Sequence, residues 1–399
     1  MRKLNYQHTV YACFAGYIVQ AVVNNFVPLL FITFSREFSI PLEKMTFLVT
    51  FNFAVQLIVD LASAWFVDRI GYRISLVAAH LLAAAGLAML TFLPGLAGDP
   101  FAGLLCSVMV YAVGGGLLEV LVSPVVESCP TQNKEKTMSL LHSFYCWGHV
   151  GVVLVSTVFF RFAGTSCWRI LCLAWTAIPL LNLLLFTAVP LAPITGDGEA
   201  GLSASRLFRM RIFWLFMLMM LCAGASEQAV SQWASALAEK EFGISKTTGD
   251  IAGPMLFAVF MGSSRAFYGK FGDRINLGSF MRISVCLCII SYLIVAFVPV
   301  PAFALAGCAL CGLSVGIMWP GTFSMAAASV RRGGTAMFAF LALAGDVGCS
   351  AGPTVSGLAS GFFGGNLRLG ILCAVIFPVL MLVLAFTRRN SADSQADKK

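Results

Sequence analysis

Four carboxylic acids lie well inside long apolar runs of the sequence: Asp60, Glu119, Glu227 and Asp346. An acid at the centre of a membrane helix costs about 2.5 to 3.5 kcal/mol to insert. Such a group persists where it is paired or hydrated, or where it has a task. Acids removed from bulk water can bind and release protons, and they can hold polar ligands.

Glu119 and Glu227 are the two candidates for proton coupling. For Glu119 the alternative is a structural acid that is paired with a basic or amide neighbour. Glu227 could instead bind substrate hydroxyls directly, or pair structurally with Gln228 or Gln232. The residue types alone leave these alternatives open.

Long helices are needed to position these acids. The 399-residue chain is 59% hydrophobic and 11% charged, against about 45 to 50% and about 25% in soluble domains, so its surface must face lipid. Helices are expected because isolated strands leave backbone groups unpaired in lipid. We predict twelve spans, each near the roughly 20 residues that a bilayer requires: residues 9–34, 43–66, 74–95, 100–124, 138–161, 168–190, 211–237, 249–271, 278–298, 301–328, 335–362 and 367–387.

Basic residues indicate the orientation, because membrane insertion retains them preferentially on the cytoplasmic side. With the N-terminus inside, most of the 26 lysine and arginine residues fall in the inner segments. We therefore predict a multi-pass protein of the cytoplasmic (plasma) membrane with both termini in the cytoplasm. The net charge of +8 then reflects this topology, and we expect no binding to nucleic acid.

The chain carries an internal repeat. Asp68 and Arg69 stand in a turn between two spans, and Asp273 and Arg274 repeat the pattern half a chain later. Further matches follow in the same order, and their separation falls smoothly along the chain, as expected of two repeated halves. One of them aligns Gly148-His149-Val150-Gly151 with Gly345-Asp346-Val347-Gly348.

The repeat predicts an all-α membrane protein with two pseudo-symmetric halves of six helices each. A polar, glycine-rich stretch between the halves is typical of a linker. We place the N-terminal bundle at residues 1–192, the cytoplasmic linker at 193–209, the C-terminal bundle at 210–389 and a short cytoplasmic tail at 390–399.

Together, the twelve spans, the two parallel halves and the Asp-Arg loop resemble the major facilitator superfamily over the whole chain. Three segments resemble more narrowly its subgroup of fucose, glucose and galactose proton symporters: Gly114–Glu119 with Ser123-Pro124, Leu140–Tyr145, and Gly316–Ser324. The chain departs from the subgroup in two places. The proton-handling acid of helix 1 is replaced by the neutral pair Asn24-Asn25, and the first loop motif has Ala64 in place of its leading glycine.

The resemblance implies a secondary transporter that works by alternating access, with helices 1, 4, 7 and 10 lining a central cavity. Glu119 then occupies the position of the subgroup's coupling acid, and we expect symport of a proton with a small solute, a sugar. Alternatives are an efflux antiporter of an amphipathic compound and a membrane sensor that binds a solute without moving it. On the cavity-lining helices, the resemblance implies that the solute is bound by Asn24, Asn25, Gln228, Trp233 and Trp319.

A further group of residues is predicted to control the conformational change. Asp60 and Arg265 each precede the loop aspartate of their half by eight residues, so the repeat places unlike charges in equivalent positions. These two residues could act in gating or could simply pair with other charges. For His149 the alternative is a buried structural role. The full set is Asp60, Asp68, Arg69, Arg73, Arg265, Asp273, Arg274, His149 and Asp346.

The sequence does not favour an enzyme. Gly348–Gly352 has the spacing of a hydrolase nucleophile elbow, but that motif requires a strand before the serine, and here it lies within a predicted helix. Most of the thirteen cysteines lie inside spans, where they suit packing better than metal binding. We therefore expect no cofactor and no metal, and we expect the chain to work in the lipid bilayer as a monomer.

Overall fold

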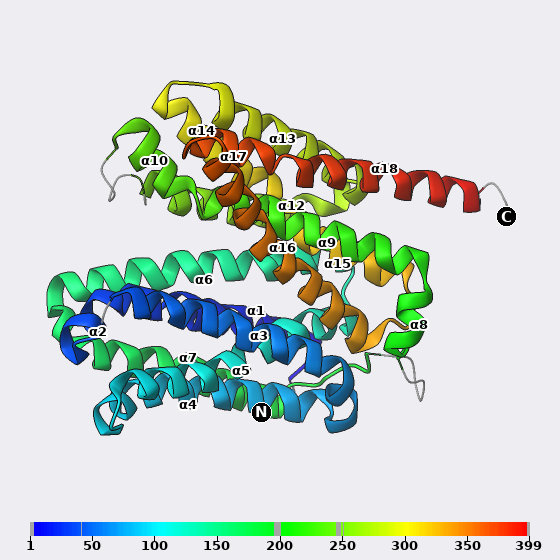
Figure 1. Cartoon of the computed structure of the whole chain (residues 1–399). Coiled ribbons are helices and arrows are strands. Elements are labelled where there is room, and N and C mark those ends of the chain that lie inside the picture. The colour runs from blue at the N-terminus through cyan, green and yellow to red at the C-terminus, as the bar shows by residue number, and fades with distance from the viewer. Residues whose placement is uncertain (1–3, 41, 195–200, 245–248, 250, 397–399) are drawn as a thin grey trace. The chain divides into compact units, whose positions relative to one another are not determined.

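The computed structural model describes residues 4–40, 42–194, 201–244, 249 and 251–396, with side chains for all of these except 32, 42–46 and 388–396. Every regular element in this part of the chain is helical (Figure 1), which confirms the predicted all-α fold. Eleven candidate spans among the described residues are long and apolar enough to cross a membrane. The predicted span 249–271 is formed by a π-helical turn, η3 (Ile251–Met255), and by α12 (Leu256–Phe271).

Contacts between Cα atoms divide the chain into two compact units. Unit 1 contains Met1–Thr131, Phe144–Ala204 and Arg332–Phe340. It holds the larger part of α6 (Lys134–Ala163) and the first turns of α16 (Gly334–Phe362). Its other helices are α1 (Tyr6–Asn25), η1 (Val27–Leu30), α2 (Phe31–Phe38), α3 (Leu42–Ile70), α4 (Tyr72–Leu96), α5 (Pro100–Ser128), η2 (Thr165–Cys167) and α7 (Trp168–Ala188).

Helix α5 lies at the centre of unit 1, where it packs against α1, α3 and α4. Consecutive glycines in α5 permit the close approach of α3 and α4. A Cβ atom on Gly114 would lie 2.5 Å from the carbonyl oxygen of Ala79 in α4, and one on Gly116 would lie 3.1 Å from the Cα atom of Gln56 in α3. These glycines therefore bring the polar face of α3, which includes Asp60, close to α5.

The first Asp-Arg loop connects α3 to α4 through Gly71. Its φ angle of +93° lies in the region that favours glycine. Two residues later, the Arg73 guanidinium donates to the carbonyl oxygens of Phe186, Thr187 and Val189 at 2.7, 3.0 and 2.9 Å. Because the last carbonyls of a helix have no partner within it, Arg73 caps the end of α7 and ties it to α4.

Unit 2 contains Gln132–Ser143, Ser205–Arg331 and Leu341–Lys399. In it α14 packs against α9, α12 and α13. Three of its predicted spans are interrupted, at Gln232–Trp233, at Gly316–Ile317 and at Ala374–Val375. Besides η3, α12 and parts of α6 and α16, the helices are α8 (Ala204–Arg209), α9 (Arg211–Ser231), α10 (Ala234–Phe242), η4 (Gly272–Arg274), α13 (Leu277–Phe297), α14 (Pro301–Val315), α15 (Met318–Ser329), α17 (Leu367–Cys373) and α18 (Ile376–Ala396).

Helices α6 and α16 each belong to both units. The start of α6, up to Ser143, groups with unit 2, and the start of α16, up to Phe340, groups with unit 1. These helices are equivalent in the sequence repeat, so the exchange of segments is reciprocal. The division into 1–192, 193–209, 210–389 and 390–399 stays a prediction, and residues 195–200 of the linker and 397–399 of the tail lie outside the described residues.

Candidate functional site

Asn24 is the centre of an amide network in unit 1. Its side-chain oxygen accepts hydrogen bonds from Asn52 Nδ2 at 3.1 Å and from Gln56 Nε2 at 2.7 Å, both on α3. Its own Nδ2 group donates to the hydroxyl of Tyr145 on α6 at 3.5 Å. The neighbouring Asn25 instead donates to the carbonyl oxygen of Ala21 in its own helix, at 2.8 Å. The predicted pair is thus divided between the network and the backbone of α1.

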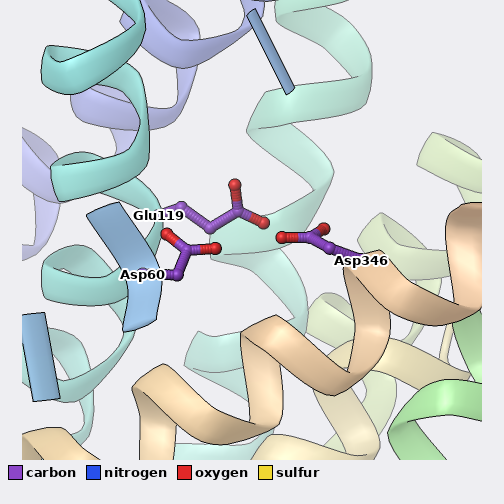
Figure 2. A group of neighbouring side chains, drawn as sticks. All are labelled: Asp60, Glu119 and Asp346. Atoms are coloured by element: carbon purple, nitrogen blue, oxygen red, sulfur yellow. The ribbon is translucent and has the colours of Figure 1, made fainter. Parts of the chain in front are cut away.

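Glu119 and Asp60 bring two carboxyl groups together in the same unit. Oxygen atoms of the two groups lie within 4.8 Å of each other, and Figure 2 shows the two side chains next to each other, one on α5 and one on α3. Asp60 is 0% exposed and Glu119 is half-buried. Gln20 on α1 donates its Nε2 group to Oε2 of Glu119 at 2.7 Å. Asp346, also drawn in Figure 2, belongs to unit 2.

Arg265 is the centre of the buried polar cluster of unit 2. Its Nη2 atom lies 3.4 Å from Oε2 of Glu227 on α9. Its Nε group donates to the carbonyl oxygen of Gly316 at 2.8 Å, and its Nη1 group donates to that of His142 at 3.2 Å. Gln228 Nε2 donates to Oε1 of Glu227 at 3.2 Å. Glu227 therefore has the structural pairing with Gln228 that the sequence suggested, and an arginine partner in addition.

The contacts of Arg265 explain how the interruption between α14 and α15 is stabilised. A helix that ends leaves carbonyl groups without intrahelical partners, and the guanidinium supplies a donor to Gly316 at that end. The Ser139 hydroxyl, at the start of α6, donates in turn to the carbonyl oxygen of Arg265 at 2.8 Å. Arg265 thus joins α9, α12, the α14–α15 interruption and the start of α6.

Both candidate tryptophans pack against glycines of α16 in unit 2. A Cβ atom on Gly345 would lie 2.2 Å from Cη2 of Trp319, and one on Gly357 would lie 2.9 Å from Cζ2 of Trp233. Trp233 also donates its Nε1 group to the carbonyl oxygen of Pro353 at 3.0 Å. The two indoles therefore have structural contacts, and their stacking on a solute stays a prediction.

The loop aspartate of unit 1 contacts the segment that α16 contributes to this unit. The Thr335 hydroxyl donates to Oδ1 of Asp68, and it also shares a hydrogen bond with the Tyr72 hydroxyl. Thr335 is 0% exposed, whereas Asp68 and Arg69 are exposed. This loop is therefore tied to the start of α16 through a buried hydroxyl.

The loop aspartate of unit 2 has an equivalent contact with the start of α6. Lys136 Nζ lies 2.5 Å from Oδ2 of Asp273, and Asn133 Nδ2 donates to Oδ1 at 3.0 Å. These hydrogen bonds, that of Lys136 first, hold the pKa of Asp273 below its usual value. Arg274, next in the chain, is exposed. In both copies of the loop, the aspartate thus binds the start of a helix that is divided between the units. Asp68 accepts from the hydroxyl of Thr335, whereas Asp273 pairs with the charged amine of Lys136.

His149 and Asp346 occupy equivalent helices in different units. His149 lies on the part of α6 that belongs to unit 1, and Asp346 on the part of α16 that belongs to unit 2. Both side chains are half-buried. Their assignment to the conformational change stays a prediction.

Comparison with known proteins identifies the family. The model of the Major Facilitator Superfamily matches residues 12–353. Membrane protein MosC of Rhizobium meliloti is 23% identical over 295 residues, which are 73% of this chain and 70% of that protein. The E. coli fucose:proton symporter FucP is 17% identical and superposes with a TM-score of 0.84 over 96% of this chain and 99% of its own. The proton:xylose symporter XylE is 13% identical, with a TM-score of 0.80 over 96% and 95%.

Because the identities to these two solved structures are low, their similarity shows a shared fold, and it confirms the predicted fold class. The match to the family model covers most of the sequence, and it is this match that shows which family the chain belongs to. The chain therefore belongs to the major facilitator superfamily, and it is a multi-pass membrane protein that acts as a secondary transporter and not as an enzyme.

Proposed function

We propose that the protein carries a small neutral sugar across the plasma membrane together with a proton. The observation that carries this proposal is the position of Glu119, a half-buried acid within a membrane span that accepts a hydrogen bond from Gln20 of α1. An ionisable group inside a membrane helix bundle is by default a candidate for proton or solute transfer. Fucose:proton and proton:xylose symporters share the fold, which supports the same chemistry.

The amide network of unit 1 supports a polyhydroxylated solute. The side-chain oxygens of Asn52 and Gln56 are buried and have no hydrogen-bond partner in the part of the chain that the structure describes. Since buried polar atoms are nearly always paired, acceptors in this condition suit the hydroxyl groups of a sugar. Asn24 holds both amides in place. Within unit 2, the candidate residues for the solute are Glu227, Gln228, Trp233 and Trp319.

The loop contacts support alternating access. In this proposal the two loops face the cytoplasm, and Asp68 and Asp273 hold the starts of α16 and α6 in one state of the cycle. The bonds from Thr335 and Lys136 to these aspartates break when the two halves rock around the solute. The transporter works as a monomer, with both termini in the cytoplasm.

Uptake into proteoliposomes with an imposed pH gradient tests the proposal. Radiolabelled fucose, xylose, glucose and galactose are offered in turn, and a pH-sensitive dye reports proton entry. We expect one of these sugars to accumulate with protons, and we expect Glu119→Gln to lose accumulation while it keeps exchange of labelled for unlabelled sugar. Glu239→Gln, an exposed acid of α10, is the matched control. Wild-type protein that moves no protons with any sugar, or full accumulation by Glu119→Gln, would contradict the proposal.

A further inference from the structure

The carboxyl groups of Asp60 and Glu119 are held together by the packing of unit 1. They lie within 4.8 Å of each other, and the close approach of α3 and α5 at Gly116 fixes their separation. Asp60 is 0% exposed. Two carboxylates that share a site away from water do not ionise independently, so they titrate as one coupled unit.

A second observation points to a hydrogen-bond donor at this place. The Gln20 side chain, 3% exposed, donates its Nε2 group to Glu119. The carbonyl oxygen of the same amide is buried and has no hydrogen-bond partner among the described residues. An acceptor without a donor therefore lies beside the carboxyl pair. A protonated carboxyl group is a donor, whereas a carboxylate only accepts, so a proton bound by the pair supplies what the amide oxygen lacks.

Three titratable side chains on α1, α4 and α6 have hydrogen-bond partners of their own. The Tyr17 hydroxyl of α1 is bonded to Ser123, and the His80 ring of α4 is bonded to Asn182 and to its own helix. The Tyr145 hydroxyl of α6 accepts a hydrogen bond from Asn24. Helix α1 carries no acid at all.

We propose that Asp60 and Glu119 form a single proton-carrying pair, in which one proton is bound by one of the two carboxyl groups. The Gln20 amide orients Glu119 through its Nε2 group and accepts from the protonated carboxyl through its oxygen. The pair rests on the proposed proton coupling and makes it more specific. Asp60 on α3 supplies the second acid of the pair, since α1 carries no acid. The proton binds to one carboxylate oxygen of the pair and is later released from the pair. No other covalent bond changes.

Infrared titration of the purified protein in lipid tests the pair without any solute. The carboxylic-acid C=O band is followed against pH in wild type, Asp60→Asn and Glu119→Gln. We expect each variant to lose part of this band, and we expect the titration midpoint of the remaining acid to shift by more than about one pH unit. Ser63 is buried on the same helix but carries no carboxyl group, so Ser63→Ala should leave the titration unchanged. Midpoints that stay at their wild-type values in both carboxyl variants would overturn the pair.

A transport measurement with labelled fucose distinguishes the pair from a single coupling acid. Asp60→Asn is expected to keep fucose exchange and to lose gradient-driven accumulation at least tenfold, as Glu119→Gln does, while Asp60→Glu retains it. Full accumulation by Asp60→Asn beside loss in Glu119→Gln would overturn the pair and leave the proposed symport standing. If wild type moves no protons with fucose, the symport of this sugar fails, and the infrared titration still decides the pair. If Asp60→Asn does not fold, the midpoint shift in Glu119→Gln alone decides it.

Discussion

Arg265 and Glu227 form a buried ion pair in unit 2, with Nη2 and Oε2 at 3.4 Å and side chains that are 5% and 14% exposed. Arg265 also donates to the carbonyl oxygens of Gly316 and His142. Loss of one partner from such a pair leaves a charge that solvent cannot reach, which typically costs about 3 to 5 kcal/mol. The pair therefore links a residue that was predicted to couple protons or to bind the solute to the stability of the whole unit.

Glu227→Gln is expected to destabilise the protein by about 3 kcal/mol, the lower end of that range, because the two carbonyl groups still satisfy part of the guanidinium. The change is measured as a fall in the thermal unfolding midpoint in detergent. Arg265→Gln should have an effect of similar size. The double variant should lose much less stability than the sum of the two single losses, because neither charge is then left without its partner. An exposed acid, Glu239→Gln, should change stability by less than about 0.5 kcal/mol. A Glu227→Gln variant that melts like wild type would show that the pair contributes nothing.

This pair could not be predicted from the sequence. The repeat related Arg265 to Asp60, and neighbouring positions related Glu227 to Gln228. Sequence spacing gives the depth of a residue along its helix and the residues on the same face, but not how two helices are rotated against each other. The hydrogen bond from Gln228 to Glu227 could be predicted because the two residues are adjacent in the sequence. The contacts of Arg265 with Glu227 and of Asp60 with Glu119 each join residues that are far apart in the chain.

The close packing at Gly114 leads to a second prediction. Its Cβ atom would lie 2.5 Å from the carbonyl oxygen of Ala79 and 2.6 Å from the amide nitrogen of Ala83, so Gly114→Ala must push α4 away from α5. We expect a loss of about 1 to 3 kcal/mol, the usual range for overpacking. Gly151→Ala in α6 is the matched control, because no atom lies within 4 Å of its Cβ position, and alanine favours the helix. Equal unfolding midpoints for the two variants would contradict the packing described for α5.

The helices themselves were largely predictable, and the long-range contacts that stabilise their interruptions were not. The predicted span 138–161 lies within α6, Lys134–Ala163, because a long apolar run has few alternatives in lipid. The predicted span 301–328 is divided at Gly316–Ile317, where the residues on both sides are equally apolar. Pro320 has no N–H group to donate to the carbonyl oxygen of Gly316 four positions earlier, so a local sign of the break is present. The Arg265 guanidinium that donates to this oxygen lies fifty-one positions earlier in the chain, and that contact could not be predicted.

Asp273 provides a prediction about pH and salt. Its hydrogen bonds to Lys136 and Asn133 lower its pKa from the ordinary value, so the folded state favours the charged form. A lowered pKa contributes stability above the ordinary value, near 3.9, and this contribution is lost as pH falls through the lower, folded value. We expect Asp273→Asn to melt below wild type at pH 5 to 8 by an amount that does not vary across this range. This difference should begin to shrink below about pH 4 and vanish only below the lowered, folded pKa.

Salt separates the charge from the hydrogen bonds at this position. The side chains of Lys136 and Asp273 are 32% and 55% exposed, so about 1 M salt should screen their attraction. The difference in melting temperature between wild type and Asp273→Asn is therefore expected to shrink in salt. The bond from Thr335 to Asp68 involves a buried hydroxyl, and the effect of Thr335→Val should be the same at both salt concentrations. A salt response of the Thr335 variant as large as that of the Asp273 variant would contradict this assignment.

Trp319 allows packing and solute binding to be separated. Its ring fills the space above Gly345 and is 9% exposed, so Trp319→Ala should destabilise unit 2 by about 3 to 5 kcal/mol. Trp319→Phe keeps an aromatic face and should cost less. If the indole also stacks on the solute, the stabilisation that a bound sugar gives to wild type should fall in Trp319→Phe, whereas Trp147→Ala, an exposed position on α6, should keep it. Thermal melting with and without sugar measures both effects, and a Trp319→Phe variant with undiminished stabilisation by sugar would assign this tryptophan to packing alone.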